Sequence, residues 1–291
     1  MKKRALIVDV AKCINCQNCV LATKDEHVGN DFPGYAASQP AGGTEWISIE
    51  QHTRGSGSTV DVAYVPRMCN HCDDAPCIKA AGGDGAAYKR PDGIVIIDPV
   101  KARGRRDLVD ACPYGSISWN EQAQLPQIWI FDAHLLDHGW AQPRCVQVCP
   151  TGALEGFHDS DAALSTLAAK QNLEVLRPEL GTRPRVFYRN LQRVQRCFIA
   201  GNVCGTNAAG LSENLEHAHV ELSIRGEPAR SAMTNAFGDF KIDGLPAAGG
   251  DYALSIRHEL YETAHITGTY RESMSLASIS MRARASHGRA A

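Results

Sequence analysis

The sequence predicts an α+β protein in which a cysteine-rich, metal-binding domain precedes an all-β domain. Nine of the eleven cysteines lie between Cys13 and Cys149, which indicates a cluster of metal ligands in the first half. Beyond about residue 196 the apolar residues alternate with polar ones, the period of half-buried strands. Between the two parts, "DAALSTLAAKQNLEVL" has apolar residues at helical spacing.

Composition bounds the class of protein. The chain has 291 residues, 44% apolar and 21% charged, which is typical of a soluble globular protein with two domains. A net charge of −2 gives no reason to expect a nucleic-acid partner. The longest apolar runs are too short to span a membrane, and Asp9 interrupts the apolar run of the N-terminus, so no signal peptide is predicted. Clustered cysteines favour metal binding in a reducing compartment, so we expect a cytoplasmic protein.

The first domain is predicted over residues 1–160 as short strands, turns and cysteine loops. The stretches "FPGYAASQPAGGTEW" and "TRGSGSTVD" carry the Gly, Pro and Ser of loops. A helix follows, with Asp159 or Ser160 as its cap, and "RPELGTRPRVFYRN" is interpreted as an extended connector. Helix and connector together occupy residues 161–195.

The second domain is predicted over residues 196–283 as a β-sandwich. Alternating apolar residues in "HAHVELSI", "DFKIDG" and "DYALSI" indicate strands, and turns recur at the spacing of such a fold. Residues 284–291, "RASHGRAA", are expected to form a flexible tail.

The cysteine spacing carries the functional signal. Cys13, Cys16 and Cys19 begin the iron–sulfur run C-x2-C-x2-C-x3-C, but the fourth position holds Thr23. In two-cluster ferredoxins the fourth cysteine, often followed by Pro, binds the other cluster. Three further runs are visible on this rule. They are Cys69, Cys72, Cys77 and Ala81; Ala102, Arg105, Leu108 and Cys112; and Trp129, Asp132, Cys145 and Cys149.

These runs resemble the iron–sulfur subunits of the dimethyl-sulfoxide-reductase family of molybdopterin oxidoreductases. That resemblance implies two paired ferredoxin-like halves, with up to four [4Fe-4S] clusters, in which the first run pairs with the fourth and the second with the third. One cluster would then take Cys13, Cys16, Cys19 and Cys149, and another would take Cys69, Cys72, Cys77 and Cys112. The other two family sites lack ligands: one has Ala81, Ala102, Arg105 and Leu108, and the other has Thr23, Trp129, Asp132 and Cys145.

Other interpretations of the same residues stay open. Zinc also uses the C-x2-C spacing, and Asp132 with Cys145 could hold a third metal centre. His71 lies between two ligands and is expected to be a hydrogen-bond donor near a cluster rather than a ligand. His217 and His219 share a predicted strand face and could bind a metal, but solvated histidines are the favoured interpretation.

Two more features have plain structural explanations. Cys197 and Cys204 fall on one predicted strand with opposite parity, so they are expected to be inert buried or edge thiols. The basic stretch "KARGRR" could meet an acidic partner, but a solvated loop in place of a lost cysteine run is favoured.

A closer resemblance covers nearly the whole chain. "DVAKCINCQNC", "FPGYAAS", "DGIVIIDPVKA", "CPYGSISWNE" and "RPELGTRPRVFYRN" are similar to the small subunits of pyrogallol–phloroglucinol transhydroxylases and resorcinol hydroxylases. "TNAFGDFKIDGLPAAGGDY" resembles the transthyretin-like and carboxypeptidase-regulatory sandwich domains. The resemblance implies a heterodimer in anaerobic aromatic degradation, whose large subunit holds molybdenum on two pterin guanine dinucleotides. It implies no catalytic residue on this chain.

The resemblance also implies three clusters, with cysteines where this chain has Thr23, Trp129 and Asp132. Loss of that middle cluster favours a subunit of an aromatic hydroxylase or transhydroxylase whose two [4Fe-4S] clusters tune or stabilise the complex. The alternative is an electron-transfer subunit that passes electrons between molybdenum and an external carrier. A scaffold with purely structural cysteines is the third hypothesis, since fold alone does not give function.

Overall fold

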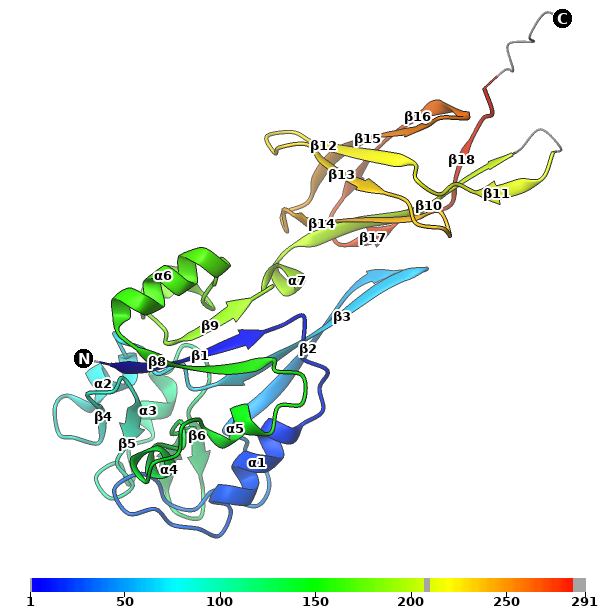
Figure 1. The fold of residues 1–291 in the computed structure, drawn as a ribbon. Helices are drawn as coiled ribbons and strands as arrows, with labels where there is room; N and C mark the ends of the chain where they lie inside the picture. Colours follow the sequence, from blue (N-terminus) through cyan, green and yellow to red (C-terminus); the bar gives the residue numbers. More distant parts are fainter. Residues whose placement is uncertain (1, 207–209, 285–291) are drawn as a thin grey trace, which may run out of the picture. The chain divides into compact units, whose positions relative to one another are not determined.

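The computed structural model describes residues 2–206 and 210–284, and the chain forms two compact units (Figure 1). The first unit comprises Met1–Gln51 and Ala63–Leu191, and the second comprises His52–Val62 and Gln192–Ala291. The second unit thus includes a segment that the sequence analysis assigned to the first domain. Among the described residues, no helix is long and apolar enough to cross a membrane.

A three-stranded sheet lies at the centre of the first unit, in the order β8 (Leu154–Asp159), β1 (Lys3–Asp9) and β9 (Val186–Arg189) (Figure 1). Strand β1 is antiparallel to β8 and parallel to β9. Its residues 5–8 are at most 2% exposed, so this short apolar run forms core. The sequence predicted an extended connector where β9 lies. The alternating burial of Val186 and Tyr188 makes that segment a strand of the sheet instead.

Short helices and hairpins surround this sheet and carry the cysteine loops. The helix predicted from residue 161 is confirmed, because the Ser160 hydroxyl caps α6 by accepting the Ala163 N–H at 3.2 Å. The remaining elements of this unit are α1 (Asn18–His27), α2 (Pro76–Ala81), β4 (Ala87–Lys89), β5 (Val95–Ile97), α3 (Asp107–Asp110), β6 (Ser118–Asn120), β7 (Leu125–Gln127), α4 (Ala133–Asp137), α5 (Arg144–Gln147), α6 (Asp161–Gln171) and the 3₁₀ turn η1 (Pro178–Leu180).

The stretch "TRGSGSTVD" is not a loop, as the sequence analysis expected, but the tip of a hairpin. Strands β2 (Ile47–Ser56) and β3 (Thr59–Met68) pair across it. Gly55 and Gly57 take positive φ angles of 86° and 66° at the turn, which glycine adopts at little cost. The glycines and serines therefore make a tight turn, and β3 leads directly into Cys69.

The second unit contains two sheets that share one apolar core. One sheet has the order β11-β10-β14, with β17 and β18 also paired to β10, and the other has the order β13-β12-β15-β16. Ile199, Val203 and Ile242 from the first sheet pack with Val220 and Leu254 from the second. The elements are α7 (Gln192–Gln195), β10 (Cys197–Thr206), β11 (Ser212–Asn214), β12 (His219–Ile224), β13 (Arg230–Met233), β14 (Asp239–Leu245), β15 (Gly250–His258), β16 (Tyr261–Tyr270), β17 (Met274–Ser275) and β18 (Ile279–Met281).

The three strands predicted in this region are confirmed as β12, β14 and β15. The predicted tail differs at its first residue. The Arg284 backbone N–H donates to the Leu260 carbonyl at 3.0 Å and its Nε donates to the Tyr261 carbonyl at 2.8 Å, so Arg284 is attached to the sheet. Residues 285–291 lie outside the described part of the chain.

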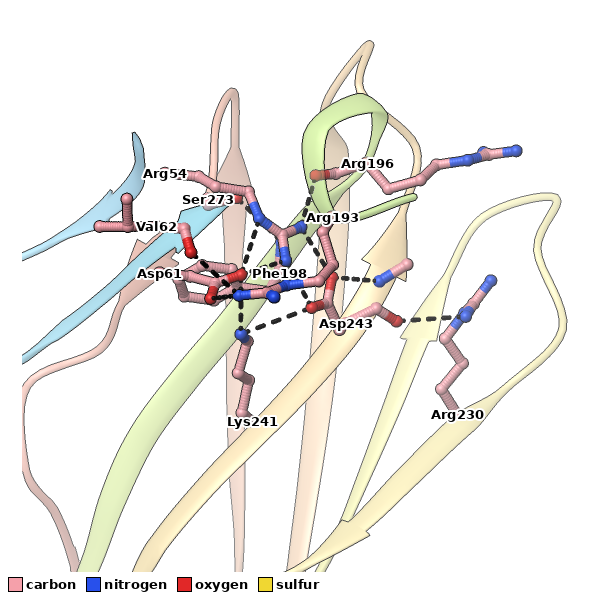
Figure 2. Close-up of polar contacts among 11 residues, drawn as sticks. Arg54, Asp61, Val62, Arg193, Arg196, Phe198, Arg230, Lys241, Asp243 and Ser273 are labelled. Carbon is pink, nitrogen blue, oxygen red and sulfur yellow. Dashed lines mark hydrogen bonds and ion pairs between the residues drawn. The ribbon is translucent and has the colours of Figure 1, made fainter. Parts of the chain in front are cut away.

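A network of charged side chains fixes the hairpin tip within the second unit (Figure 2). Arg54 donates to Asp61 at 2.6 Å and to Asp243 at 2.7 Å. Arg193 also binds Asp61, at 2.5 Å. The Arg54 guanidinium and the Lys241 ammonium lie over the Phe198 ring, 5.3 Å and 4.4 Å from its centre, so the tip is held by both ion pairs and cation–π contacts.

Candidate iron–sulfur centres

The first predicted ligand set comes together in the structure. Cys13 and Cys16 lie in the loop after β1, Cys19 is on α1, and Cys149 follows α5. All four residues line one cavity. The rest of its wall is mostly apolar and is formed by Ile14, Ile49, Pro66, Thr151, Ala153 and Leu154. The loop and the helix therefore supply four sulfur atoms around a mainly apolar space.

Burial makes two of these thiols, Cys13 and Cys19, poor acids while no cation is present. It raises the pKa of Cys19 to about 12, and the neighbouring Cys13, Cys16 and Cys149 add to the effect. Burial also raises the pKa of Cys13, while the backbone N–H of Asn15 acts in the opposite direction. A bound cation reverses this preference, because metal-coordinated thiols lose their protons. The donor set thus fits a positively charged, thiophilic centre.

The second predicted set also comes together. Cys69 follows β3 and Cys72 lies in the next loop, while Cys77 is in the first turn of α2 and Cys112 follows α3. Burial raises the pKa of Cys69 well above its ordinary value, and Cys77, Cys112 and Cys72 raise it further. Burial raises the pKa of Cys77 to about 11, with Cys112 and Cys72 as its charged neighbours. The pKa of Cys69 and the pKa of Cys77 are therefore both raised by other members of the set.

Backbone contacts hold the second loop in place. Lys89 Nζ donates to the carbonyl oxygens of His71 and Cys72 at 2.8 Å and 2.9 Å. The Asp73 N–H donates to the Arg183 carbonyl at 2.9 Å, and the Asp74 N–H donates to the Thr182 carbonyl at 3.0 Å. These contacts position the sulfur atoms, and Lys89 adds a positive charge near them.

His71 contacts the second set through its backbone. Its backbone N–H donates to Cys69 Sγ at 3.5 Å, while its ring Nε2 has no hydrogen-bond partner among the described residues. Its ring Nδ1 accepts the Val95 N–H at 3.1 Å, so the proton of the neutral ring is on Nε2. Burial, helped by the charges of Lys89 and Arg185, lowers the ring's pKa to about 3. The imidazole therefore stays neutral.

Three C-x2-C-like segments share one backbone turn. The residue before the second ligand position is Asn15 in the first run, His71 in the second and Phe131 in the fourth. Their φ angles are 58°, 44° and 57°, in the left-handed region that non-glycine residues rarely adopt. In the first two loops this turn directs an N–H toward a cysteine sulfur. Segment 129–132 therefore has the turn of a cysteine loop without its cysteines.

The side chains at the positions where the resemblance implies a third cluster make contacts within the protein. Trp129 is fully buried and stacks on Phe131 at 4.7 Å. The Thr23 hydroxyl donates to the Cys19 carbonyl at 2.9 Å. Asp132 Oδ2 accepts the backbone N–H of Arg144 at 2.8 Å. Each of these side chains is thus engaged within the protein.

These positions border both ligand sets. The centre of the Trp129 ring lies 5.5 Å from that of the His71 ring. His71 stands between two cysteines of the second set in the sequence. Cys145 is 0% exposed, and the first-set residues Cys19 and Cys149 help to raise its pKa, after burial and Asp132. The buried Trp129 ring therefore lies near the second set, and the buried Cys145 thiol lies near the first.

Apolar and ion-paired residues fill the fourth family position. Ala81, Ala102 and Leu108 are at most 4% exposed. Arg105 forms ion pairs with Asp84 and Asp107 and donates to the Ala80 carbonyl. Intramolecular contacts therefore account for the arginine at the centre of the "KARGRR" stretch.

The other candidate ligands do not assemble. Among residues 2–206 and 210–284, no three His, Cys, Asp or Glu side chains are grouped as they would be around a single metal ion. His217 has a φ of 60° and precedes β12, which begins at His219. The two histidines therefore do not share a strand face, contrary to the prediction, because the turn at His217 breaks the alternation. Cys197 is buried and Cys204 is half-buried beside Ser278, and both are free thiols.

Sequence reasoning missed one buried polar pair. His27 Nε2 lies 3.4 Å from Asp132 Oδ1, and the two side chains are 0% and 1% exposed. They are 105 residues apart in sequence, so no local pattern joins them. The available signal was the spacing of Cys19, Thr23 and His27 at i, i+4 and i+8, which places His27 on the ligand-bearing face of a helix.

Comparisons with known proteins agree with this geometry. Residues 60–158 match the family described as "4Fe-4S dicluster domain". The chain is 40% identical over 259 residues to the pyrogallol hydroxytransferase small subunit of Pelobacter acidigallici, covering 88% of this chain and 91% of the relative. It is 33% identical over 191 residues to a tetrathionate reductase subunit of Salmonella typhimurium, covering 64% of this chain and 72% of that relative. The 5-hydroxyisourate hydrolase of Klebsiella pneumoniae is similar over 30% of this chain and 86% of that chain, at 20% identity and a TM-score of 0.24.

The match and the relation to the small subunits define an iron–sulfur protein. The chain belongs to the family of iron–sulfur small subunits that includes the pyrogallol hydroxytransferase small subunit, among the iron–sulfur subunits of the dimethyl-sulfoxide-reductase family. The weak structural likeness assigns no fold family to the second unit.

Proposed function

We propose that this chain is the iron–sulfur subunit of a molybdopterin-dependent phenol hydroxylase or transhydroxylase and carries two [4Fe-4S] clusters. One observation carries the proposal: two separate sets of four thiols assemble, while buried side chains fill the other two family positions. The proposed ligands are Cys13, Cys16, Cys19 and Cys149 for one cluster, and Cys69, Cys72, Cys77 and Cys112 for the other.

The clusters would supply one-electron redox chemistry, and the chain's own residues would hold and tune them. Hydrogen bonds to sulfur and burial are the protein's main means of setting cluster potentials. The N–H groups of Asn15 and His71 reach cysteine sulfurs in the two sets. We also propose the paired ferredoxin-like fold for the first unit and the transthyretin-like sandwich for the second.

The proposed partner is a large subunit that binds the phenol and holds molybdenum on two pterin guanine dinucleotides. The support is the relation to a small subunit of a hydroxytransferase over most of both chains. We assign no catalytic residue to this chain, because its reactive side chains are the proposed cluster ligands. The free state of all eleven cysteines supports a reducing, cytoplasmic location.

A second candidate is an electron-transfer subunit of another molybdenum oxidoreductase. The similarity to a subunit of tetrathionate reductase favours it, because that relative's name describes a net reduction. The buried Trp129 and Cys145 between the two sets favour the first candidate. An intact chain of clusters is needed for conduction, whereas transfer of a hydroxyl between rings involves no net electron flow.

The test uses the complex purified anaerobically through a tag on this chain. We expect a larger subunit to co-purify with about one molybdenum per complex. We expect hydroxyl transfer between phenols without an added electron acceptor, or net hydroxylation of a phenol, a two-electron oxidation, with one. A complex that turns over only with an external acceptor and does not act on phenols would support the electron-transfer candidate. Purification without molybdenum or a partner would reject both.

A further inference from the structure

A buried imidazole and a buried carboxylate meet in the first unit outside the two proposed ligand sets. His27 Nε2 lies 3.4 Å from Asp132 Oδ1. Aromatic rings surround the imidazole, with ring centres at 4.6 Å for Trp46 and 5.3 Å for Phe32. The pair is therefore buried within the protein. The second ring nitrogen of His27, Nδ1, has no hydrogen-bond partner among the described residues.

Helix α1 links this pair to the first ligand set. Cys19, Thr23 and His27 are all buried and lie four residues apart, so they share one helix face. Eight residues of α-helix span about 12 Å. Asp132 and the first-set residues Cys19 and Cys149 also affect the same fully buried Cys145 thiol. The pair is thus within electrostatic reach of the first set, through a water-poor interior that screens charges weakly.

The other charged groups near the pair largely compensate one another. Glu26 of α1 binds His134 Nε2 of α4 at 2.8 Å and Arg144 Nη1 of α5 at 2.5 Å. Burial lowers the pKa of His134, against the opposing effect of Glu26. Burial keeps the Cys145 thiol protonated by raising its pKa. Among these ion-paired side chains the His27–Asp132 pair is the most buried, with exposures of 0% and 1%.

We propose that the His27–Asp132 pair is a proton-binding site whose occupancy follows the redox state of the cluster held by the first ligand set. This inference rests on the proposed function, because it needs a cluster at Cys13, Cys16, Cys19 and Cys149. With a neutral imidazole the pair carries one negative charge, and with a protonated imidazole it carries none. The added proton is taken up by His27 and stabilised by Asp132.

The coupled step balances in charge and atoms. One electron, from the partner's redox centre or a low-potential chemical reductant, enters the oxidised cluster, and one proton from water enters the pair. The ring centre of His134 lies 5.3 Å from that of His27, and Glu26, which binds His134, has a side chain that is 16% exposed. Because the added electron favours the protonated pair, the midpoint potential of this cluster must fall as the pH rises.

The test is a redox titration of the intact complex by electron paramagnetic resonance, from about pH 5 to about pH 8, where histidines change charge. The first cluster is identified as the signal lost in Cys149→Ala. We expect its potential to fall with pH by up to about 59 mV per tenfold change in proton concentration, the one-electron limit. His27→Gln and Asp132→Asn should remove this slope, and His158→Gln, at an exposed histidine of β8, should keep it.

A second measurement needs no variant and covers the case in which the substitutions impair folding. Redox-induced infrared difference spectra of the wild-type complex, labelled with ¹³C-histidine, should show an imidazole band that changes on reduction of the first cluster. A pH-independent potential in the wild type, or a slope that persists in both iron-replete variants, would overturn the inference. Absence of iron from the wild type would instead reject the proposed function.

Discussion

Two buried thiols, one in each proposed ligand set, are chemically costly to ionise without a metal. Burial raises the pKa of Cys19 to about 12 and that of Cys77 to about 11. In the metal-free chain these groups hold protons at neutral pH, and the metal must displace them. Cluster assembly is therefore coupled to the release of protons from these thiols.

This linkage sets a pH dependence. A raised thiol pKa means that metal binding releases protons, so a lower proton concentration favours binding. We expect iron and sulfide incorporation into the metal-free chain to be weaker at about pH 6 than at about pH 8. Equilibrium reconstitution in buffered series, followed by absorbance, measures this. Equal incorporation across the range would show that the thiols are already ionised.

Cys145 and Cys149 form a matched pair of cysteines with different expected roles. Cys145 is 0% exposed beside Asp132, whereas Cys149 lines the cavity of the first set. Cys149→Ala should lower the iron content by about four atoms, the content of one [4Fe-4S] cluster. Cys145→Ala should leave the iron content unchanged, as determined by elemental analysis of the purified complex. Iron loss in Cys145→Ala would reveal a third metal centre.

Trp129 is part of the hydrophobic core, at a position where the family resemblance implies a cysteine ligand. It is fully buried and packs on Phe131 and His71. Trp129→Ala should lower the free energy of unfolding by about 3–5 kcal/mol, because it opens a large cavity. Trp140, which is 39% exposed, is the control, and Trp140→Ala should cost no more than about 0.5 kcal/mol. Chemical denaturation gives both values, and equal costs would contradict the filled-site interpretation.

At the scale of elements, the hairpin β2–β3 is stabilised at its tip by a largely buried arginine. The Arg54 side chain is 9% exposed and bridges Asp61 and Asp243 (Figure 2). Arg54→Ala should lower the free energy of unfolding of the second unit by about 1–3 kcal/mol, because it leaves the half-buried carboxylates of Asp61 and Asp243 with fewer partners. The control is Arg257→Ala, which removes an exposed pair with Glu221 and should cost less than about 1 kcal/mol. Similar thermal shifts for both variants would show that the network is dispensable.

Local sequence patterns predicted the elements that are recognised from the spacing of nearby residues. Helix α6 followed from its spacing and its Ser160 cap, and strand β12 followed from its alternation. Strand β9 and the hairpin β2–β3 were interpreted as connectors, because short segments rich in Gly, Ser, Pro and Arg resemble loops until their partner strands are known. Sheet pairing is a long-range property that a single segment does not reveal.

The candidate site shows the same division. Cysteine spacing indicated the runs in advance, and the family resemblance implied how the runs combine into the two thiol sets. The His27–Asp132 pair joins residues 105 positions apart and was not foreseen. The positive φ angle of Phe131 was also not foreseen, because phenylalanine is not typical of that conformation.

At the scale of the whole molecule, the two units are not consecutive in sequence. The second unit takes residues 52–62 from within the first. Strand β3 runs from that tip to Met68, the residue before the first cysteine of the second set. A cut after residue 191 would therefore remove most of the second unit but leave its hairpin tip on the first.

The central claim is that this chain holds two four-iron clusters and that protein fills the position between them. The most direct measurement is iron and acid-labile sulfide per copy of this chain, in complex purified anaerobically and corrected for any cluster on the partner. The account predicts about eight iron and about eight sulfide. About twelve of each would contradict it, because a third cluster would then exist where the structure has Thr23, Trp129, Asp132 and Cys145.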